Sequence, residues 1–182
     1  MFTDNEGIRS GAVWGLCFIA IAFFFSFQRL INQIFAESFV IKFVSLEIAL
    51  FLLFLTAIMH VRGYVYAGSK YNLNLLKISA FAQAIILGFF GLSVMASVFV
   101  GAFDLGPTKI YDTLIGLFVL LLLIAEILFA FSMIQLYRKI GILALLTAPF
   151  PLWVIFIWYG WPALLFFIPS TLLLFKESDS NP

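Results

Sequence analysis

Residues 113–136 read TLIGLFVLLLLIAEILFAFSMIQL, and Glu126 is the one charged residue in this run. A helix of this length measures about 36 Å at 1.5 Å per residue, which is more than the ~30 Å thickness of the hydrocarbon core of a bilayer. Its apolar side chains would lie on every side, as is typical of a helix surrounded by lipid. The stretch therefore predicts a transmembrane helix.

The rest of the chain has the same character. Hydrophobic residues make up 64% of it and charged residues 10%, against about 25% charged in an ordinary soluble domain. The sequence predicts one all-α domain over residues 1–182, a polytopic membrane bundle of six transmembrane helices. The expected spans are residues 11–27, 39–59, 78–103, 113–136, 140–157 and 162–175.

The last two predicted spans come from a single stretch. Residues 140–175 carry no charge and are too long for one straight helix, and the segment WYGWP at 158–162 interrupts them. We expect a tight turn there, held at the outer membrane surface by its aromatic rings. Pro149, Pro151 and Pro169 are expected to bend the two helices, because proline removes a backbone donor.

Lys and Arg are distributed unequally between the two sides of such a bundle. Cytoplasmic loops of membrane proteins carry an excess of these residues. The side opposite the N-terminus holds Arg29, Lys42 and Lys109. The side of the N-terminus holds the others: Arg9, Arg62, Lys70, Lys77, Arg138, Lys139 and Lys176. We therefore expect a multi-pass protein of the cell membrane with both termini in the cytoplasm.

Charge and residue counts also exclude several classes of partner. The net charge is +1 and the basic residues are scattered, whereas nucleic-acid binding requires them to be clustered. His60 is the one histidine and Cys17 the one cysteine, so neither a haem site nor a metal site is expected. The sequence predicts no cofactor, no metal and no nucleic-acid partner.

Glu47 and Glu126 are the candidates for chemistry. A charged carboxylate inside a membrane helix costs roughly 3 kcal/mol and usually faces protein or water rather than lipid. Each precedes basic residues by a similar interval, so the sequence predicts one shared depth, ~18–22 Å from the inner boundary. One interpretation is a neutral, hydrogen-bonded acid that holds two helices together, and the other is a proton or cation site. His60 is interpreted as an interfacial residue beside Arg62.

Small residues predict the faces on which helices pack. Gly11 and Gly15 form a GxxxG pattern, and Ser93, Ser97 and Gly101 recur at every fourth position of the third span. Small side chains at this spacing let two helix backbones approach closely. We expect these residues to contact other helices of the bundle or a partner subunit.

Three segments carry a resemblance to a known group of proteins. They are NEGIRSGAVWGL at 5–16, YAGSKYNLNLLKI at 66–78 and LYRKIGILALLTAPF at 136–150. These segments resemble parts of small archaeal multi-pass membrane proteins of uncharacterised function. The resemblance implies a membrane bundle and brings no catalytic residues with it.

Two functional hypotheses remain. The first is a non-catalytic helical subunit of a larger membrane complex, of respiratory or transport type, whose partners are the lipid bilayer and other membrane subunits or further copies of the chain. The second is a small proton- or cation-coupled carrier or solute-binding subunit that uses Glu47 and Glu126. An intramembrane enzyme would need a reactive pair at matching depth, such as Ser with His or two Asp, so enzymatic activity is not expected.

Overall fold

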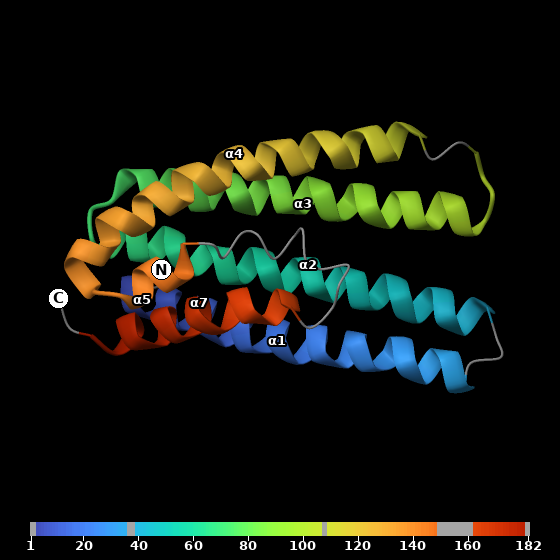
Figure 1. Cartoon of the computed structure of the whole chain (residues 1–182), viewed down its shortest axis with the longest axis horizontal. Helices are drawn as coiled ribbons and strands as arrows, with labels where there is room; N and C mark the ends of the chain where they lie inside the picture. The colour runs from blue at the N-terminus through green and yellow to red at the C-terminus, as the bar shows by residue number, and fades with distance from the viewer. Residues whose placement is uncertain (1–2, 36–38, 107–108, 149–161, 181–182) are drawn as a thin grey trace.

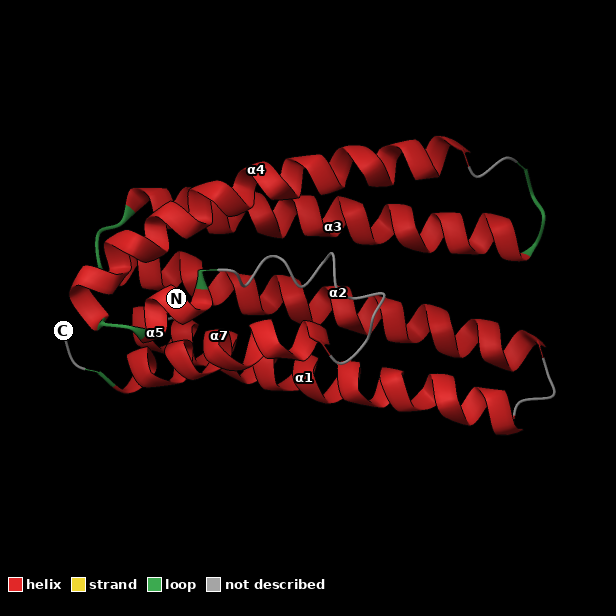
Figure 2. Ribbon diagram, viewed as in Figure 1, coloured by secondary structure: helices red, strands yellow, loops and turns green. Residues whose placement is uncertain are grey.

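Four long helices make up most of the chain. The computed structural model describes the backbone of residues 3–35, 39–106, 109–148 and 162–180 and, among these, the side chains of all but 24–35, 39–43, 45 and 162–166. The long helices are α1 (Asp4–Phe35), α2 (Phe39–Lys70), α3 (Asn74–Ala102) and α4 (Lys109–Ile140). Consecutive long helices run in opposite directions along the bundle (Figures 1 and 2). All four are long and apolar enough to cross a membrane, so the predicted all-α helical bundle is confirmed.

After α4, the described residues form one very short helix and one longer helix, and not two full membrane spans. α5 covers Leu143–Thr147 and α7 covers Pro162–Asp179, which at helical rise is about 27 Å. α7 lies beside α1 and begins about midway along the bundle (Figure 1). Half of the predicted fifth span and most of the turn at 158–162 lie outside the described residues. A bundle of six spans therefore remains a prediction.

α1 starts earlier than predicted because its first turn is capped. The Thr3 hydroxyl accepts a hydrogen bond from the Glu6 N–H at 3.3 Å, and the Glu6 carboxylate accepts one from the Thr3 N–H at 2.8 Å. This reciprocal arrangement is a capping box, which satisfies backbone donors that the helix itself leaves free. The helix can therefore begin at Asp4, outside the apolar run.

α2 also continues past its predicted end, to Lys70. It stops where Asn72 adopts a left-handed φ of 52° and the Leu73 N–H bonds back to the Gly68 carbonyl at 2.8 Å. A left-handed residue with this backward bond is a common way to end a helix, and asparagine tolerates that conformation. His60 therefore lies well inside the helix rather than at its boundary.

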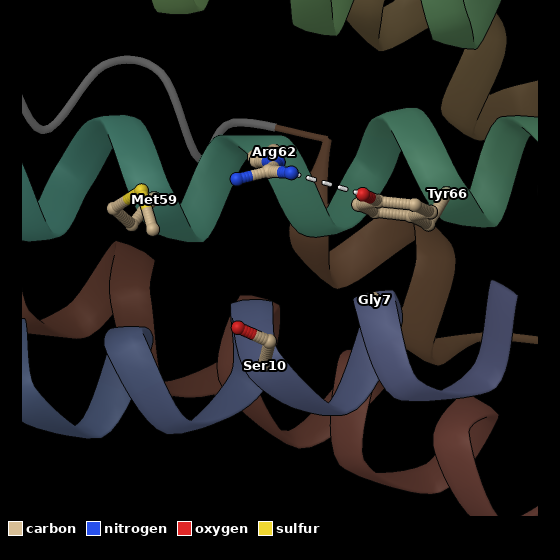
Figure 3. A pocket seen from close by; sticks show the side chains of 5 residues that line it. All are labelled: Gly7, Ser10, Met59, Arg62 and Tyr66. Atoms are coloured by element: carbon tan, nitrogen blue, oxygen red, sulfur yellow. Dashed lines mark hydrogen bonds between the residues drawn. The ribbon is translucent and has the colours of Figure 1, made fainter. Parts of the chain in front are cut away.

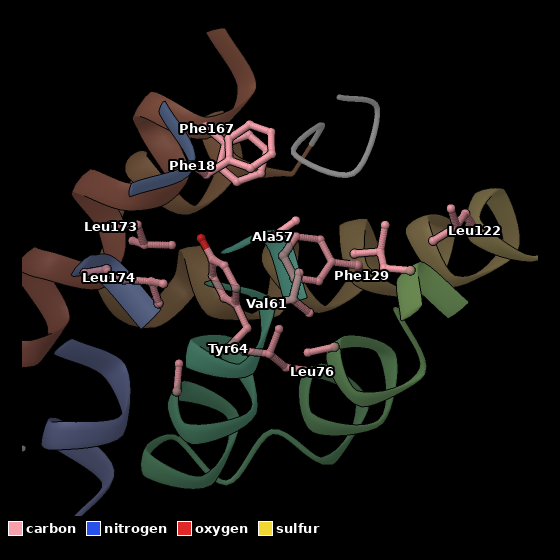
Figure 4. Close-up of a cluster of buried hydrophobic side chains, with 14 of the residues drawn as sticks. Phe18, Ala57, Val61, Tyr64, Leu76, Leu122, Phe129, Phe167, Leu173 and Leu174 are labelled. Carbon is pink, nitrogen blue, oxygen red and sulfur yellow. The ribbon is translucent and has the colours of Figure 1, made fainter. Parts of the chain in front are cut away.

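The long helices pack in chain order. α1 packs against α2 and α7, α2 against α3, and α3 against α4, while α5 lies against both α4 and α7. Aromatic side chains connect the layers: Phe54 meets the edge of Phe90 at 5.6 Å between ring centroids, and Tyr64 meets Phe129 at 5.2 Å. Figure 4 shows Tyr64 and Phe129 close together in the buried apolar cluster. The core thus joins all the described helices, α1 to α5 and α7.

The two ends of the chain lie at the same end of the bundle (Figure 1). Lys70 Nζ, at the end of α2, donates to the Ser180 carbonyl at 2.6 Å, and the Tyr66 ring of the same helix lies against Gly7 of α1. This arrangement agrees with termini on one side of a membrane. Which side they face remains a prediction.

α3 and α4 leave most of their apolar surface exposed. Half of the residues in the apolar stretch of α2 are buried, against 22% for α3 and 17% for α4. The exposed residues of α4 include Leu117, Leu120, Ile124, Ile127 and Phe131. α4 is therefore the long helix that the described chain covers least.

Candidate functional site

The two predicted acids lie on different helices and at different depths. Lys139 Nζ donates to the Tyr71 carbonyl at 2.7 Å, which places the end of α4 level with the end of α2. Counted back from that level at helical rise, Glu126 lies about 20 Å along the bundle and Glu47 about 36 Å. The shared depth predicted from the sequence is therefore wrong, and the two carboxyl groups do not meet in one site.

The error has a specific origin. The prediction takes His60 and Arg62 as the inner boundary of the second span, whereas α2 runs on for about 12 Å beyond Arg62 to Lys70. Tertiary packing supports this extra length, because Tyr64 and Ala67 are buried in the core. His60 and Arg62 therefore lie within α2 and do not mark its end.

Each acid has a distinct environment. Glu47 is partly buried, and its Oε1 is buried with no hydrogen-bond partner among the described residues. Glu126 lies near the middle of α4 and is partly exposed. Within the described part of the chain, no hydrogen bond or ion pair reaches the Glu126 carboxylate. Neither acid has its compensating partner in the described structure.

Gly11 and Gly15 lie where α1 comes closest to its neighbours. A Cβ on Gly11 would lie 2.5 Å from the Gly63 Cα of α2. A Cβ on Gly15 would lie 2.5 Å from His60 Nδ1 and would overlap the Thr171 hydroxyl of α7. Larger residues at these two positions would force the helices apart, and the contacts are intramolecular.

The serine and glycine stripe of α3 is less uniform. Ser93 is buried and donates to the Phe89 carbonyl of its own helix at 2.9 Å. Ser97 donates to Asp112 Oδ1 of α4 at 3.3 Å, and Gly101 is exposed. Of the three positions, Ser97 is the one whose side chain bonds to another helix.

A buried polar network joins α1, α2 and α7. His60 Nδ1 lies 2.8 Å from the Gly11 carbonyl, and His60 Nε2 lies 2.6 Å from Ser170 Oγ. The Tyr64 hydroxyl lies 2.6 Å from Ser170 Oγ and 3.0 Å from the Ser170 carbonyl. All three side chains are completely buried. This network is the strongest candidate site in the described chain.

The direction of each proton follows from the partners. The Gly11 carbonyl can only accept, so Nδ1 of His60 carries the proton and Nε2 is the acceptor. Ser170 then donates its hydroxyl hydrogen to Nε2, and Tyr64 donates to Ser170. A serine hydroxyl held on a neutral, oriented imidazole is the pattern of a nucleophile with its base. Here Ser170 Oγ is enclosed by both partners and buried, so the same bonds fasten α7 to α1 and α2.

Aromatic and hydroxyl side chains close the network on its other sides. The rings of Phe18 and Phe167 stack at 3.6 Å between centroids, and the Phe167 ring lies 5.2 Å from that of His60. Thr171 Oγ1 is buried without a hydrogen-bond partner among the described residues. Phe18 and Phe167 thus pack α1 directly against α7 beside the polar bonds.

This network was not predicted from the sequence. His60 was assigned to the membrane interface, and Ser170 was not singled out. Ser170 and Thr171 form a polar pair inside an otherwise apolar run, which was the available signal. Pairing them with His60 required knowing that α7 returns along α1, and no local pattern encodes that contact.

A second polar cluster holds the end of α7. Lys70 Nζ donates to the Glu177 carbonyl at 2.7 Å and to Ser180 Oγ at 2.9 Å, and the Tyr71 hydroxyl donates to the Glu177 carboxylate. Burial, with a smaller effect of the Glu177 hydrogen bond, raises the pKa of Tyr71 to about 12. The Tyr71 hydroxyl therefore stays protonated as a donor at neutral pH. This cluster ties the C-terminal segment to the turn after α2.

The described residues include no group of three or more His, Cys, Asp or Glu side chains placed to hold a metal ion. No protein-family model matches the chain, and neither a curated protein nor a solved structure matches it. The function of the chain is therefore inferred from its own residues.

Proposed function

We propose that this chain is a non-catalytic helical subunit of a larger membrane assembly and that α4 carries the contact with its partner. The network of His60, Ser170 and Tyr64 then serves the fold, by holding α7 in place. The side of α4 that the chain leaves uncovered serves the assembly.

Glu126 is the observation that carries this proposal. It lies about 26 Å from the start of α4 and about 21 Å from its end, so it is near the middle of the helix. The neighbouring Ile124 and Ile127 are exposed, and the described chain supplies no partner for the carboxylate. An acid near the bilayer centre costs roughly 3 kcal/mol when charged and faces lipid only rarely. A donor from another membrane subunit would compensate for it.

The burial pattern of α4 also supports a contact with a partner. Ala125 and Phe129 face the bundle and are buried, while 17% of the helix's apolar stretch is covered in total. The opposite side is a long apolar surface, and the partly exposed Glu126 lies at its edge, since Leu122 and Met133 on nearly the same line of the helix are buried. Such a surface suits packing against another apolar helix, with the acid fixing the register of the contact.

The alternative, a carrier that uses Glu47 and Glu126 together, has less support. The two acids differ in depth by about 16 Å at helical rise and lie on different helices, α2 and α4. A single proton or cation cannot bridge that distance. A carrier would need two separate sites connected by a path, whereas a subunit contact needs Glu126 alone.

Copurification from native membranes in mild detergent tests the proposal. Glu126→Gln keeps a donor and an acceptor and should retain the partner. Glu126→Leu should weaken its retention by about 5- to 30-fold, since hydrogen bonds between membrane helices are worth ~1–2 kcal/mol. Glu47→Leu is the matched control and should retain the partner as the parent does. Equal retention in Glu126→Leu and the parent would remove Glu126 from the contact. Proton-dependent uptake by the purified protein, lost in both Gln variants, would instead establish the carrier.

A further inference from the structure

A small cavity opens between α1 and α2 near the end of the bundle that holds the termini. It measures about 120 Å³ and is lined by Gly7 and Ser10 of α1 and by Met59, Arg62 and Tyr66 of α2 (Figure 3). None of these residues belongs to the buried network around Ser170. The cavity is therefore a separate feature of the fold.

Arg62 is the charged group of this cavity. One Nη of its guanidinium donates to the Tyr66 hydroxyl at 3.1 Å, and the guanidinium lies 5.7 Å from the centre of the Tyr66 ring. No carboxylate among the described residues forms an ion pair with it. A guanidinium has five N–H donors, so most of them are left for a ligand, and their fork geometry matches phosphate oxygens.

Ser10 supplies a second polar group from the opposite wall. Its side chain points from α1 toward α2 (Figure 3), and its hydroxyl makes no hydrogen bond within the described residues. Glu6, on the preceding turn, directs its carboxylate back to the Thr3 N–H at 2.8 Å. The ring of Tyr66 lies against Gly7 and forms the floor of the cavity. The groups available to a ligand are thus a cation and hydroxyls.

The position of the cavity along the helices indicates where its ligand comes from. α2 is about 48 Å long and a bilayer's hydrocarbon core is ~30 Å thick, so a centred α2 extends about 9 Å beyond it at each end. Arg62 lies about 12 Å from the end at Lys70, close to the level where acyl chains meet headgroups. Long basic side chains at this level reach toward the headgroups.

Polarity changes along α2 as it does along a phospholipid. Arg62 and Tyr66 lie toward the end of the helix, Met59 lines the inner side of the cavity, and Leu55 and Phe51 follow as exposed apolar residues toward the bilayer centre. We propose that this cavity binds the phosphate of a membrane phospholipid, held by Arg62 and Ser10, with the acyl chains lying along Met59, Leu55 and Phe51. The apolar continuation distinguishes a lipid from free phosphate.

Native mass spectrometry of the full chain, titrated with phosphatidylglycerol, tests this site. The parent should keep one tightly bound lipid, and Arg62→Gln should weaken that binding by about tenfold or more, because a hydrogen bond to a charged group contributes ~1.5–3 kcal/mol. Arg62→Lys should fall between the two, since the charge stays and the fork is lost. Arg138→Gln removes an exposed arginine at the same end of the bundle and should bind as the parent does.

Two further ligands identify the source of the phosphate. Diacylglycerol with the same acyl chains lacks the phosphate and should bind weakly, and inorganic phosphate at millimolar concentration should not displace the lipid. Equal binding of diacylglycerol would mean a purely apolar groove, and displacement by inorganic phosphate would mean a site for the free ion. Each of these results, or unchanged lipid binding in Arg62→Gln at an unchanged melting temperature, would overturn the proposal.

Discussion

Ser170 is the residue at which three helices are joined by hydrogen bonds. It lies on α7, donates to His60 of α2 and accepts from Tyr64, while His60 in turn bonds to the Gly11 carbonyl of α1. In a membrane most of the attraction between helices comes from packing and hydrogen bonds rather than from the hydrophobic effect. The chain therefore fixes α7 through a few buried polar atoms.

Replacing Ser170 with Ala should show how much this network contributes. The variant leaves His60 Nε2 buried without its donor, which costs ~1–3 kcal/mol in free energy of unfolding. Ser132→Ala is the matched control, because Ser132 is equally buried but bonds within its own helix, to the Phe129 carbonyl at 2.6 Å. Melting temperatures in one detergent compare the two. If the two variants have the same melting temperature, the network does not stabilise the fold.

At the scale of single residues, the sequence indicated contacts that depend on local spacing. It did not indicate contacts between residues far apart in the chain. The close contacts of Gly11 and Gly15 agree with their spacing. The partnership of His60 with Ser170 did not follow, because it depends on a contact between residues far apart in sequence. Whether Glu47 and Glu126 bind anything remains a prediction.

At the scale of elements, α1 depends on glycine to approach α2 and α7. Gly15→Ala places a methyl group against His60 and Thr171, and overpacking of this kind typically costs ~1–3 kcal/mol in free energy of unfolding. Gly116→Ala on α4 meets nothing within 4 Å and should be neutral or slightly stabilising, since alanine favours a helix over glycine by ~0.5–1 kcal/mol. Denaturation of the two variants side by side measures the difference. A Gly15→Ala protein as stable as Gly116→Ala would contradict the close packing.

The helices themselves were predictable because an apolar run of more than 20 residues has few alternatives. Their ends were not, since the capping box at Thr3 and the left-handed Asn72 extend α1 and α2 past the apolar runs. The final stretch was the hardest case. Its length suggested two spans, whereas α7 begins about midway along the bundle, and residues 149–161 lie outside the description (Figure 1).

For the whole molecule, the described chain divides into a well-packed part and an exposed part. α1, α2 and α7 are joined by the buried network and by the cluster around Lys70 and Glu177, while α3 and α4 present most of their apolar residues outward. A bundle of this kind is complete only in a surrounding of lipid or protein. The partly exposed Glu126 favours protein at the middle of α4.

Photo-crosslinking in native membranes tests that claim most directly. A photoreactive residue at Ile127, one position from Glu126, should form an adduct of discrete mass with a membrane protein or with a second copy of the chain. Leu172 of α7 is exposed to a similar degree, 54% against 57% for Ile127, and the same residue placed there should give no such adduct. Adducts with lipid alone at both positions would contradict the account, because α4 would then face the bilayer along its whole length.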